Sequence, residues 1–371
     1  MQISYAQKKS KRDILANTPV CRLNGSLISD NLLIKGDNLK VLQTLLKVYN
    51  YANKIDLIYI DPPYATNRVF SLTPDRARAV SCPKGAEAAY ADTLRGEEFL
   101  EFIRERIILA RELLSEVGSI YLHIDYKIGH YIKVIMDEIF GIENFRNDIS
   151  RIKCNPKNFN QKSYGNIKDM ILFYSKTREI IWNDPMVPYT PLDLKTLFKK
   201  TDRLGRPYTT VPLHAPGESG DSATGGLFRG LAPPPGRHWR TDPAELEKMD
   251  AHGLIEWSKS GNPRKIIYPD CQKGKKRQDI WEFKDCHLPC YPTEKNMDLL
   301  KTIIRASSND CSFVLDFFCG SGTTLLAAGV LARRWIGIDR SPMAIEITQR
   351  KLDALESGQL NHPNYSYLEE K

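Results

Sequence analysis

The chain has 371 residues, of which 42% are hydrophobic and 26% charged, and its mean hydropathy is −0.40. This composition has enough apolar residues to exclude a mainly disordered chain. No apolar run approaches roughly 18 residues, which excludes a membrane protein. The chain has only eight cysteines, which excludes a disulfide scaffold. A cytoplasmic location is therefore expected, and the net charge of +8 is compatible with a polyanionic partner without establishing one.

Short runs of β-branched and aromatic residues are typical of buried parallel strands, and amphipathic stretches between them predict helices. The clearest helix precedes Gly118, where we expect it to end. This alternation predicts an α/β fold, a doubly wound and mostly parallel sheet. The expected strands are residues 32–35, 55–60, 119–124, 170–174, 313–315 and 335–338, and the expected helices are 97–116, 130–140, 294–306 and 323–333.

The alternation stops in the middle of the chain, where Pro, Gly and polar residues dominate. The stretches GESGDSATGG (217–226) and APPPG (232–236) have loop composition. The region is too long for a simple loop, and its tryptophans indicate that it folds. We therefore predict an irregular insertion that splits one sheet, and a flexible tail at the basic run KKSKR (8–12). The predicted segments are 1–180, the insertion 181–290, and 291–371.

An apolar strand within residues 54–64 (KIDLIYIDPPY) ends in Asp61, Pro62, Pro63 and Tyr64. Ligands of α/β folds bind where strands end. Neither proline can donate a backbone hydrogen bond, so carbonyl acceptors stand beside a carboxylate and an aromatic ring. This cluster suits a planar substrate with an exocyclic amino group, whose two N–H hydrogens the carboxylate and a proline carbonyl accept while the ring stacks on tyrosine.

A second motif covers residues 313–324 (FVLDFFCGSGTT), and the strand that follows it ends in Asp339. A strand, a glycine turn and a helix form the layout of a nucleotide-binding half. Gly320 and Gly322 allow close approach of a ligand, and Asp339 is placed to accept hydrogen bonds from ribose hydroxyls. Leu325 stands where a dinucleotide fingerprint has its third glycine, which disfavours a nicotinamide dehydrogenase and leaves an adenosyl ligand without phosphates.

Together the two motifs resemble the amino-group DNA methyltransferases that use S-adenosyl-L-methionine. DPPY precedes FCGSG, with an insertion between them, which resembles the circularly permuted β class that includes the modification subunits of restriction systems. The segments IKGDNL (34–39) and YPTEKN (291–296) also resemble that class. The resemblance implies a permuted Rossmann-like methyltransferase fold, with a catalytic half, a target-recognition insertion and a cofactor-binding half.

The resemblance also implies residue roles, since Asp61, Pro62, Pro63 and Tyr64 would hold and activate the target amine. Phe317 departs from the family, which usually has proline there. The residues that would bind the cofactor are Asp37 at the adenosyl end, Thr293 and Lys295 at the methionine end, and Asp316, Phe317, Phe318, Cys319, Gly320, Ser321, Gly322, Thr323 and Asp339. The residues that would contact DNA are Arg237, Trp239, Arg240, Arg264, Lys265, Lys275, Lys276 and Arg277, although charge runs are often only solvated surface.

An acid at the first motif position favours adenine over cytosine, because the cytosine-amino enzymes of the family more often carry serine there. The expected activity is therefore site-specific methylation of adenine N6 in double-stranded DNA after base flipping. N4-cytosine methylation, methylation of RNA or protein glutamine, and a non-catalytic DNA-binding module stay open. The resemblance implies a homodimer and a cognate restriction nuclease as further partners, while the length favours a stand-alone enzyme. No metal is expected, since the residues Cys271, Cys286, His287 and Cys290 lack zinc-site spacing.

Overall fold

The computed structural model describes residues 3–63, 68–73, 76–78, 87–92, 96–156, 162–217, 222–270, 274–285, 294–356 and 364–371. The chain divides into two compact units. Unit 1 comprises Met1–Asp184 and Gln278–Lys371, and unit 2 comprises Pro185–Arg277. Unit 1 is thus assembled from two segments that unit 2 separates in sequence. No helix in the described part of the chain is long and apolar enough to cross a membrane.

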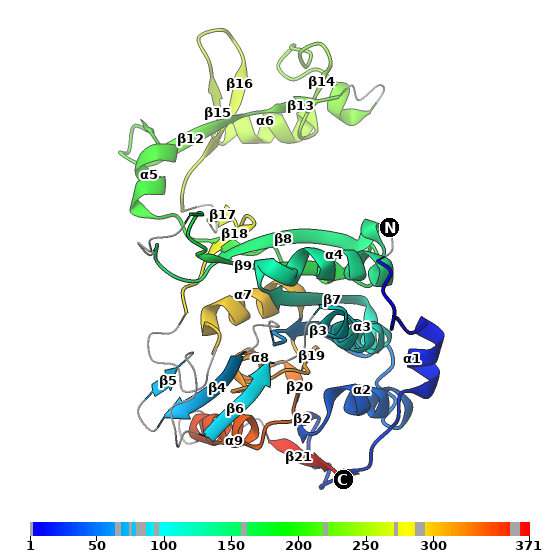
Figure 1. Cartoon of the computed structure of the whole chain (residues 1–371). Coiled ribbons are helices and arrows are strands. Elements are labelled where there is room, and N and C mark those ends of the chain that lie inside the picture. The colour runs from blue at the N-terminus through cyan, green and yellow to red at the C-terminus, as the bar shows by residue number, and fades with distance from the viewer. Residues whose placement is uncertain are drawn as a thin grey trace. The chain divides into compact units, whose positions relative to one another are not determined.

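Unit 1 contains a ten-stranded sheet with the order β1-β21-β2-β20-β19-β3-β7-β9-β8-β18 (Figure 1). The strands from β21 to β7 are parallel to one another. The late strands β19 and β20 lie between the early strands β2 and β3, so the predicted doubly wound, permuted α/β fold is confirmed. The strands are β1 Leu23–Asn24, β2 Asn31–Lys35, β3 Ile55–Ile60, β7 Leu114–Ile124, β8 Phe145–Ile152, β9 Lys168–Ser175, β18 Ile280–Glu282, β19 Phe313–Asp316, β20 Arg334–Asp339 and β21 Tyr365–Glu370.

Helices cover both faces of this sheet (Figure 1). Successive strand residues point to opposite faces, so Ile58 packs in the core beneath α2, α3 and α4 while Tyr59 packs in the core beneath α7, α8 and α9. The helices of unit 1 are α1 Lys11–Asn17, α2 Asn38–Lys47, α3 Gly96–Leu113, α4 Tyr126–Phe140, α7 Met297–Ser307, α8 Thr323–Val330 and α9 Pro342–Glu356. A separate small sheet contains β4 Arg68–Thr73, β5 Arg76–Arg78 and β6 Glu87–Asp92.

Several sequence predictions about unit 1 are wrong in detail. β9 runs antiparallel to both β7 and β8, because a strand buried on both faces has the same pattern in either direction. The helix predicted to reach residue 116 ends at Leu113, since Leu114 already pairs with Ile55 of β3. β18 falls inside the predicted insertion, yet it pairs with β8 in the large sheet.

The basic N-terminal run is also ordered, contrary to the expected flexible tail. Its lysines form ion pairs with acids of α3 and α4, and Ser10 caps α1 by accepting a hydrogen bond from the Asp13 N–H (3.0 Å). The sequence prediction failed because a lysine-rich run resembles a solvated tail, and the sequence alone does not show which acids lie opposite it in the fold. The pairs are Lys8 with Glu138 (2.6 Å), Lys9 with Glu105 (2.5 Å) and Lys11 with Glu112 (2.9 Å).

Unit 2 contains short antiparallel sheets. One of them has the order β11-β12-β16-β15, and the others are the pairs β10-β17 and β13-β14. Its core contains Leu213, Phe228, Trp239, Leu246 and Ile255. The elements are β10 Met186–Val187, α5 Pro191–Leu197, β11 Lys200–Thr201, β12 Pro207–Pro212, β13 His214–Pro216, β14 Arg237–Trp239, α6 Pro243–Ala251, β15 Ile255–Trp257, β16 Pro263–Ile267 and β17 Lys275–Lys276.

Candidate active site

Four neighbouring parallel strands of unit 1 present acidic residues at their carboxyl ends. β19 ends at Asp316 and β20 at Asp339, while Asp61 directly follows β3. Since β19 pairs with β20 on one side and with β3 on the other, these carboxylates lie along one edge of the sheet. Asp37 follows β2, which pairs with β20. The carboxyl edge of a parallel sheet is where α/β folds bind ligands.

The glycine turn after β19 is tied to β20 by hydrogen bonds. The Gly320 N–H donates to Asp339 Oδ2 (2.9 Å), and the Cys319 N–H donates to a carbonyl of β20 (3.1 Å). Gly322 precedes α8 with a φ of 73°, and a Cβ atom there would lie 2.5 Å from Thr348 Cγ2. Only glycine fits this position, so the turn packs against α9 as closely as a nucleotide-binding turn requires.

Burial controls the ionisation of the two carboxylates beside the turn. It raises the pKa of Asp316 to about 7, although hydrogen bonds from Thr324 and the Phe318 N–H favour the ionised form. Burial also raises the pKa of Asp339, whose Oδ1 accepts from the Ser341 N–H (2.9 Å). Neither carboxylate forms an ion pair with any residue that the structure describes. A buried acid such as Asp316, which forms no ion pair with a described residue, suits a ligand that brings positive charge.

Helices α2 and α3 contribute two residues that the sequence patterns did not single out, Asn38 and Arg106. Asp37 caps α2 by accepting from the Leu39 N–H (2.9 Å), and Arg106 Nη2 lies 3.9 Å from its carboxylate. Asn38 Nδ2 donates to the Phe317 carbonyl (2.6 Å), and its Oδ1 accepts from Arg106 Nε (2.6 Å). These bonds fix the glycine turn to both helices. Arg106 occupies a buried position on its helix. A cation within the apolar stripe of a predicted helix is the sequence feature from which Arg106 could have been predicted as a site residue.

A lysine from the second segment of unit 1 holds the acid after β3. Asp61 Oδ2 lies 2.6 Å from Lys295 Nζ, and the two side chains are only 14% and 9% exposed. Pro62 is buried and Pro63 half-buried next along the chain. The sequence grouped Lys295 with the cofactor residues, whereas the structure pairs it with Asp61. Two predicted site residues and the cysteines and histidine weighed as a zinc site lie outside the described residues: Tyr64, Thr293, Cys271, Cys286, His287 and Cys290.

A buried polar network extends from the same strand end toward β8. The Tyr59 hydroxyl lies 2.9 Å from His123 Nδ1, and His123 Nε2 lies 3.3 Å from Asp169 Oδ2. Asp169 also pairs with Lys153 (2.6 Å) and Arg151 (3.4 Å). Burial opposes ionisation of Asp169, but hydrogen bonds and charges from His123 and Lys153 outweigh it and hold its pKa well below the usual range. Burial lowers the pKa of His123, although its hydrogen bond to Asp169 favours the protonated ring.

In unit 2, three of the predicted DNA-contacting arginines gather around His214. Arg237 Nη1 lies 3.2 Å from His214 Nδ1, and Arg240 Nε donates to the His214 carbonyl (3.3 Å). Arg264 donates to Thr210 through Nε and Nη2, both at 2.9 Å. Burial first, and then the positive charges of all three arginines, lower the pKa of His214. The structure therefore brings together basic residues that are 27 positions apart in sequence, Arg237 to Arg264.

The remaining predicted basic residues lie elsewhere in unit 2. Lys275 pairs with Asp193 (2.8 Å), and together with Lys276 it forms β17, which pairs with β10. Arg277 follows directly, and burial lowers its pKa. Lys265 faces the side of β16 opposite to the preceding arginine, because strand side chains alternate. The predicted basic set therefore does not form one surface.

The predicted DNA contact of Trp239 is wrong. The side chain is 2% exposed and packs edge-to-face against Phe228, with ring centroids 6.1 Å apart. Its Nε1 donates to the Gly226 carbonyl (2.9 Å), which satisfies the indole N–H inside the core. A tryptophan between two arginines resembles a base-stacking residue in sequence, but here it holds the small core of unit 2 together.

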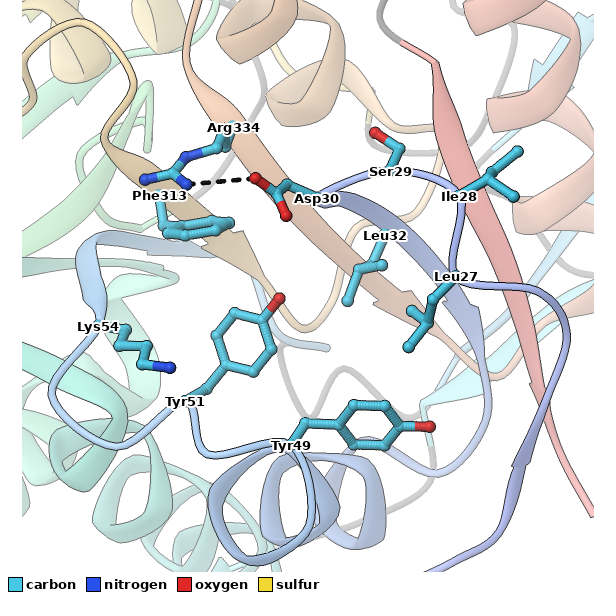
Figure 2. A pocket seen from close by; sticks show the side chains of 10 residues that line it. All are labelled: Leu27, Ile28, Ser29, Asp30, Leu32, Tyr49, Tyr51, Lys54, Phe313 and Arg334. Atoms are coloured by element: carbon cyan, nitrogen blue, oxygen red, sulfur yellow. Dashed lines mark hydrogen bonds and ion pairs between the residues drawn. The ribbon is translucent and has the colours of Figure 1, made fainter.

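A cavity of about 850 Å³ opens at the opposite edge of the large sheet, where β2, β19 and β20 begin (Figure 2). Arg334 pairs with Asp30 across it (3.3 Å), and its guanidinium lies 3.9 Å from the Phe313 ring centroid. Tyr51 contacts the same ring edge-to-face at 5.6 Å. None of the predicted site residues lines this cavity, so it is separate from the carboxyl edge.

Comparison with known proteins agrees with this geometry. Residues 55–350 match the family N6_N4_Mtase, described as DNA methylase. The chain is 41% identical over 351 residues to the type II methyltransferase M.EcaI of Enterobacter cloacae, covering 93% of this chain and 74% of that protein. It is 30% identical over 338 residues to the type III restriction-modification StyLTI Mod subunit of Salmonella typhimurium, covering 82% of this chain and 50% of the subunit. For the EcoPI Mod subunit of Escherichia phage P1 the values are 27%, 82% and 55%, so the chain spans about half the length of both Mod subunits.

Proposed function

Since the chain belongs to the N6_N4_Mtase family of DNA methylases, we propose that it transfers a methyl group from S-adenosyl-L-methionine to adenine N6 at a specific site in DNA. One observation carries the proposal. β19 and β3 are paired, so the glycine turn and buried Asp316 stand next to Asp61 and Pro62. The place for a cationic adenosyl ligand and the place for a planar amine thus share one edge of the sheet.

The residues of this edge fit the cofactor. The buried carboxylates of Asp316 and Asp339 form no ion pair with a described residue, and a Cβ atom at Gly322 would strike α9. When bound, the cofactor supplies a methyl group on a positively charged sulfur. The residues proposed to hold it are Asp37, Asp316, Phe317, Phe318, Cys319, Gly320, Ser321, Gly322, Thr323 and Asp339, with Thr293.

The exocyclic nitrogen of adenine is a poor nucleophile, because its lone pair is delocalised into the ring. Hydrogen bonds from the amine to the Asp61 carboxylate and the Pro62 carbonyl draw the nitrogen toward a pyramidal geometry, which localises that lone pair. Acceptors fixed at a strand end need no rearrangement during reaction, and this preorganisation lowers the barrier. Tyr64, next in sequence, is proposed to stack on the flipped base.

Replacing Asp61 by Ala tests the function. The variant should lose methylation of DNA by at least about 1,000-fold, since an acceptor made for the transition state is gone, while calorimetry shows unchanged cofactor affinity. The matched control is Asp56→Ala, at the opposite end of the same strand, where Ser115 Oγ donates to the carboxylate (2.9 Å). Methylation by Asp61→Ala at the wild-type rate would contradict the proposal.

Analysis of methylated DNA identifies the base that is modified. Long-read sequencing and nucleoside mass spectrometry of host DNA, with and without the protein, should show N6-methyladenine at one recognition sequence. N4-methylcytosine would correct the base, and no modified base in DNA would overturn the function. A restriction nuclease that cuts the same sequence is the partner this function implies, and a homodimer is a second proposed partner.

We place DNA phosphates on the arginine cluster of unit 2, defined as Arg237, Arg240 and Arg264. Three arginines around a histidine of lowered pKa form a basic cluster whose positive charge phosphates neutralise. Arg237→Ala should lower the slope of log affinity against log salt by about one. Its matched control is Lys248→Ala on α6, where the lysine pairs with Glu245 (3.1 Å). An unchanged slope in Arg237→Ala would exclude this contact.

A further inference from the structure

Lys295 is fixed by the residues on both sides of it. Asn296 caps α7, accepting from the Asp298 N–H (2.9 Å), and its Nδ2 donates to the Lys284 carbonyl (3.0 Å). On the other side, Glu294 forms an ion pair with Lys351 of α9. The backbone at Lys295 is therefore anchored to the helix behind it and to a second helix, so the ammonium position is set by the fold.

The ion pair of Lys295 with Asp61 is also shielded from solvent. Both side chains are about nine-tenths buried, unlike a surface pair, in which solvent screens the attraction and both side chains stay mobile. His123 lies close enough for Lys295 to lower its pKa and for Asp61 to raise it, in each case after the larger effect of burial. The pair thus stands beside the buried hydrogen bond between Tyr59 and His123.

We propose that Lys295 is a positioning residue for the Asp61 carboxylate in the methylation reaction, rather than a cofactor ligand. This inference rests on the proposed function. An Asp side chain has two rotatable bonds, and a buried ammonium 2.6 Å from Oδ2 selects one orientation of the carboxylate plane before any base arrives. Lys295 therefore acts on the amine acceptor, and its removal misaligns the acceptor without removing a cofactor contact.

The experiment separates the two roles. In Lys295→Met the rate at saturating cofactor and DNA should fall about 100-fold, the cost of a small misplacement of a catalytic group, while the cofactor dissociation constant stays unchanged by calorimetry. Lys295→Arg keeps the charge and should recover part of the rate. Lys133→Met is the matched control, because it breaks a partly buried ion pair with Asp137 on α4 (2.8 Å) and leaves Asp61 and Lys295 untouched.

Two outcomes would overturn the inference. One is a weakened cofactor affinity in Lys295→Met with a wild-type rate at saturation, which would make the lysine a cofactor ligand. The other is a wild-type rate and affinity together. If Lys295→Met melts below the assay temperature, Lys295→Arg decides, since a lower rate with unchanged affinity supports positioning and weaker affinity alone contradicts it. An inactive Asp61→Ala beside a fully active Lys295→Met would reject only this inference, whereas a fully active Asp61→Ala would reject the function itself.

Discussion

Buried acids in unit 1 occur in two contrasting settings. Asp169, on β9, is surrounded by His123, Lys153 and Arg151, and its pKa lies well below the usual range. Asp316, on β19, is equally buried, but its neighbours are hydrogen-bond donors and the carboxylates of Asp61 and Asp339, and burial raises its pKa to about 7. The sheet is the same and the burial is similar, so the difference lies in the cations.

A buried charge is costly unless another charge and hydrogen bonds compensate for it. At Asp169 the chain supplies that compensation, so the carboxylate is a permanent part of the fold. At Asp316 the described residues supply hydrogen bonds but no ion pair, so a cationic ligand has the most to gain by binding there. The contrast teaches that an acid lacking its cation marks a ligand site, and an acid with its cations marks structure.

The largest effect on stability is expected when Asp169, the acid that is compensated by cations, is replaced. In Asp169→Asn the half-buried Lys153 loses its anion and the buried Arg151 keeps only Asp285 as an acidic partner among the described residues, so the free energy of unfolding should fall by about 3–5 kcal/mol. Urea denaturation followed by circular dichroism measures this loss. Because the pKa of Asp169 is depressed in the fold, its stabilisation is present above its ordinary pKa of 3.8 and disappears as the pH falls. The difference in the free energy of unfolding between the variant and the wild type should therefore become smaller as the pH is lowered.

Asp310→Asn is the matched control. Asp310 also pairs with an arginine, Arg333 at 2.6 Å, but its side chain is 85% exposed. Arg333 keeps its hydrogen bonds to Ser308 and the Leu331 carbonyl when the carboxylate is neutralised, so stability should hardly change. Equal losses of stability in Asp169→Asn and Asp310→Asn would show that burial does not make an ion-paired acid more important for stability, which would contradict this prediction.

Much of the carboxyl edge could be predicted from the sequence. Asp61, Asp316 and Asp339 each follow an apolar run, and strand ends in a parallel sheet meet at one edge. The glycine turn could be predicted for the same reason, because Gly320 and Gly322 mark a backbone conformation directly. These features are local in sequence, and local patterns carry them.

The partners of these acids could not be predicted, because they come from distant positions. Lys295 lies 234 residues after Asp61 in the chain, and no periodic pattern connects them. Charge runs misled for the same reason. The N-terminal lysines find acids of α3 and α4, and Trp239 enters a core formed by residues up to 26 positions away. Whether a cation is paired depends on tertiary contacts that composition does not contain.

The smaller and more specific test concerns the uncompensated acid. The folded-state pKa of Asp316 is about 7, and a cationic ligand favours its ionised form, so binding must remove its proton at low pH. The affinity for S-adenosyl-L-methionine should therefore weaken about tenfold between pH 8 and pH 6. Calorimetry in buffers of different ionisation enthalpy should show that binding at pH 6 releases a proton.

Asp316→Asn isolates this carboxyl, because any titration of the cofactor itself is common to both proteins. The variant should bind the cofactor more weakly at pH 8 and lose the part of the pH dependence that belongs to the protein. It should also be more stable than the wild type at pH 8, since a carboxyl pKa raised in the fold costs the wild type stability, and this cost builds up from about pH 3.8 to pH 7 and is fully present at pH 8. Weaker binding together with higher stability is a combination that a packing defect cannot produce, because a defect would lower both. If the variant instead binds as tightly as the wild type at every pH, Asp316 is a structural acid like Asp169, and the missing cation does not mark the ligand site.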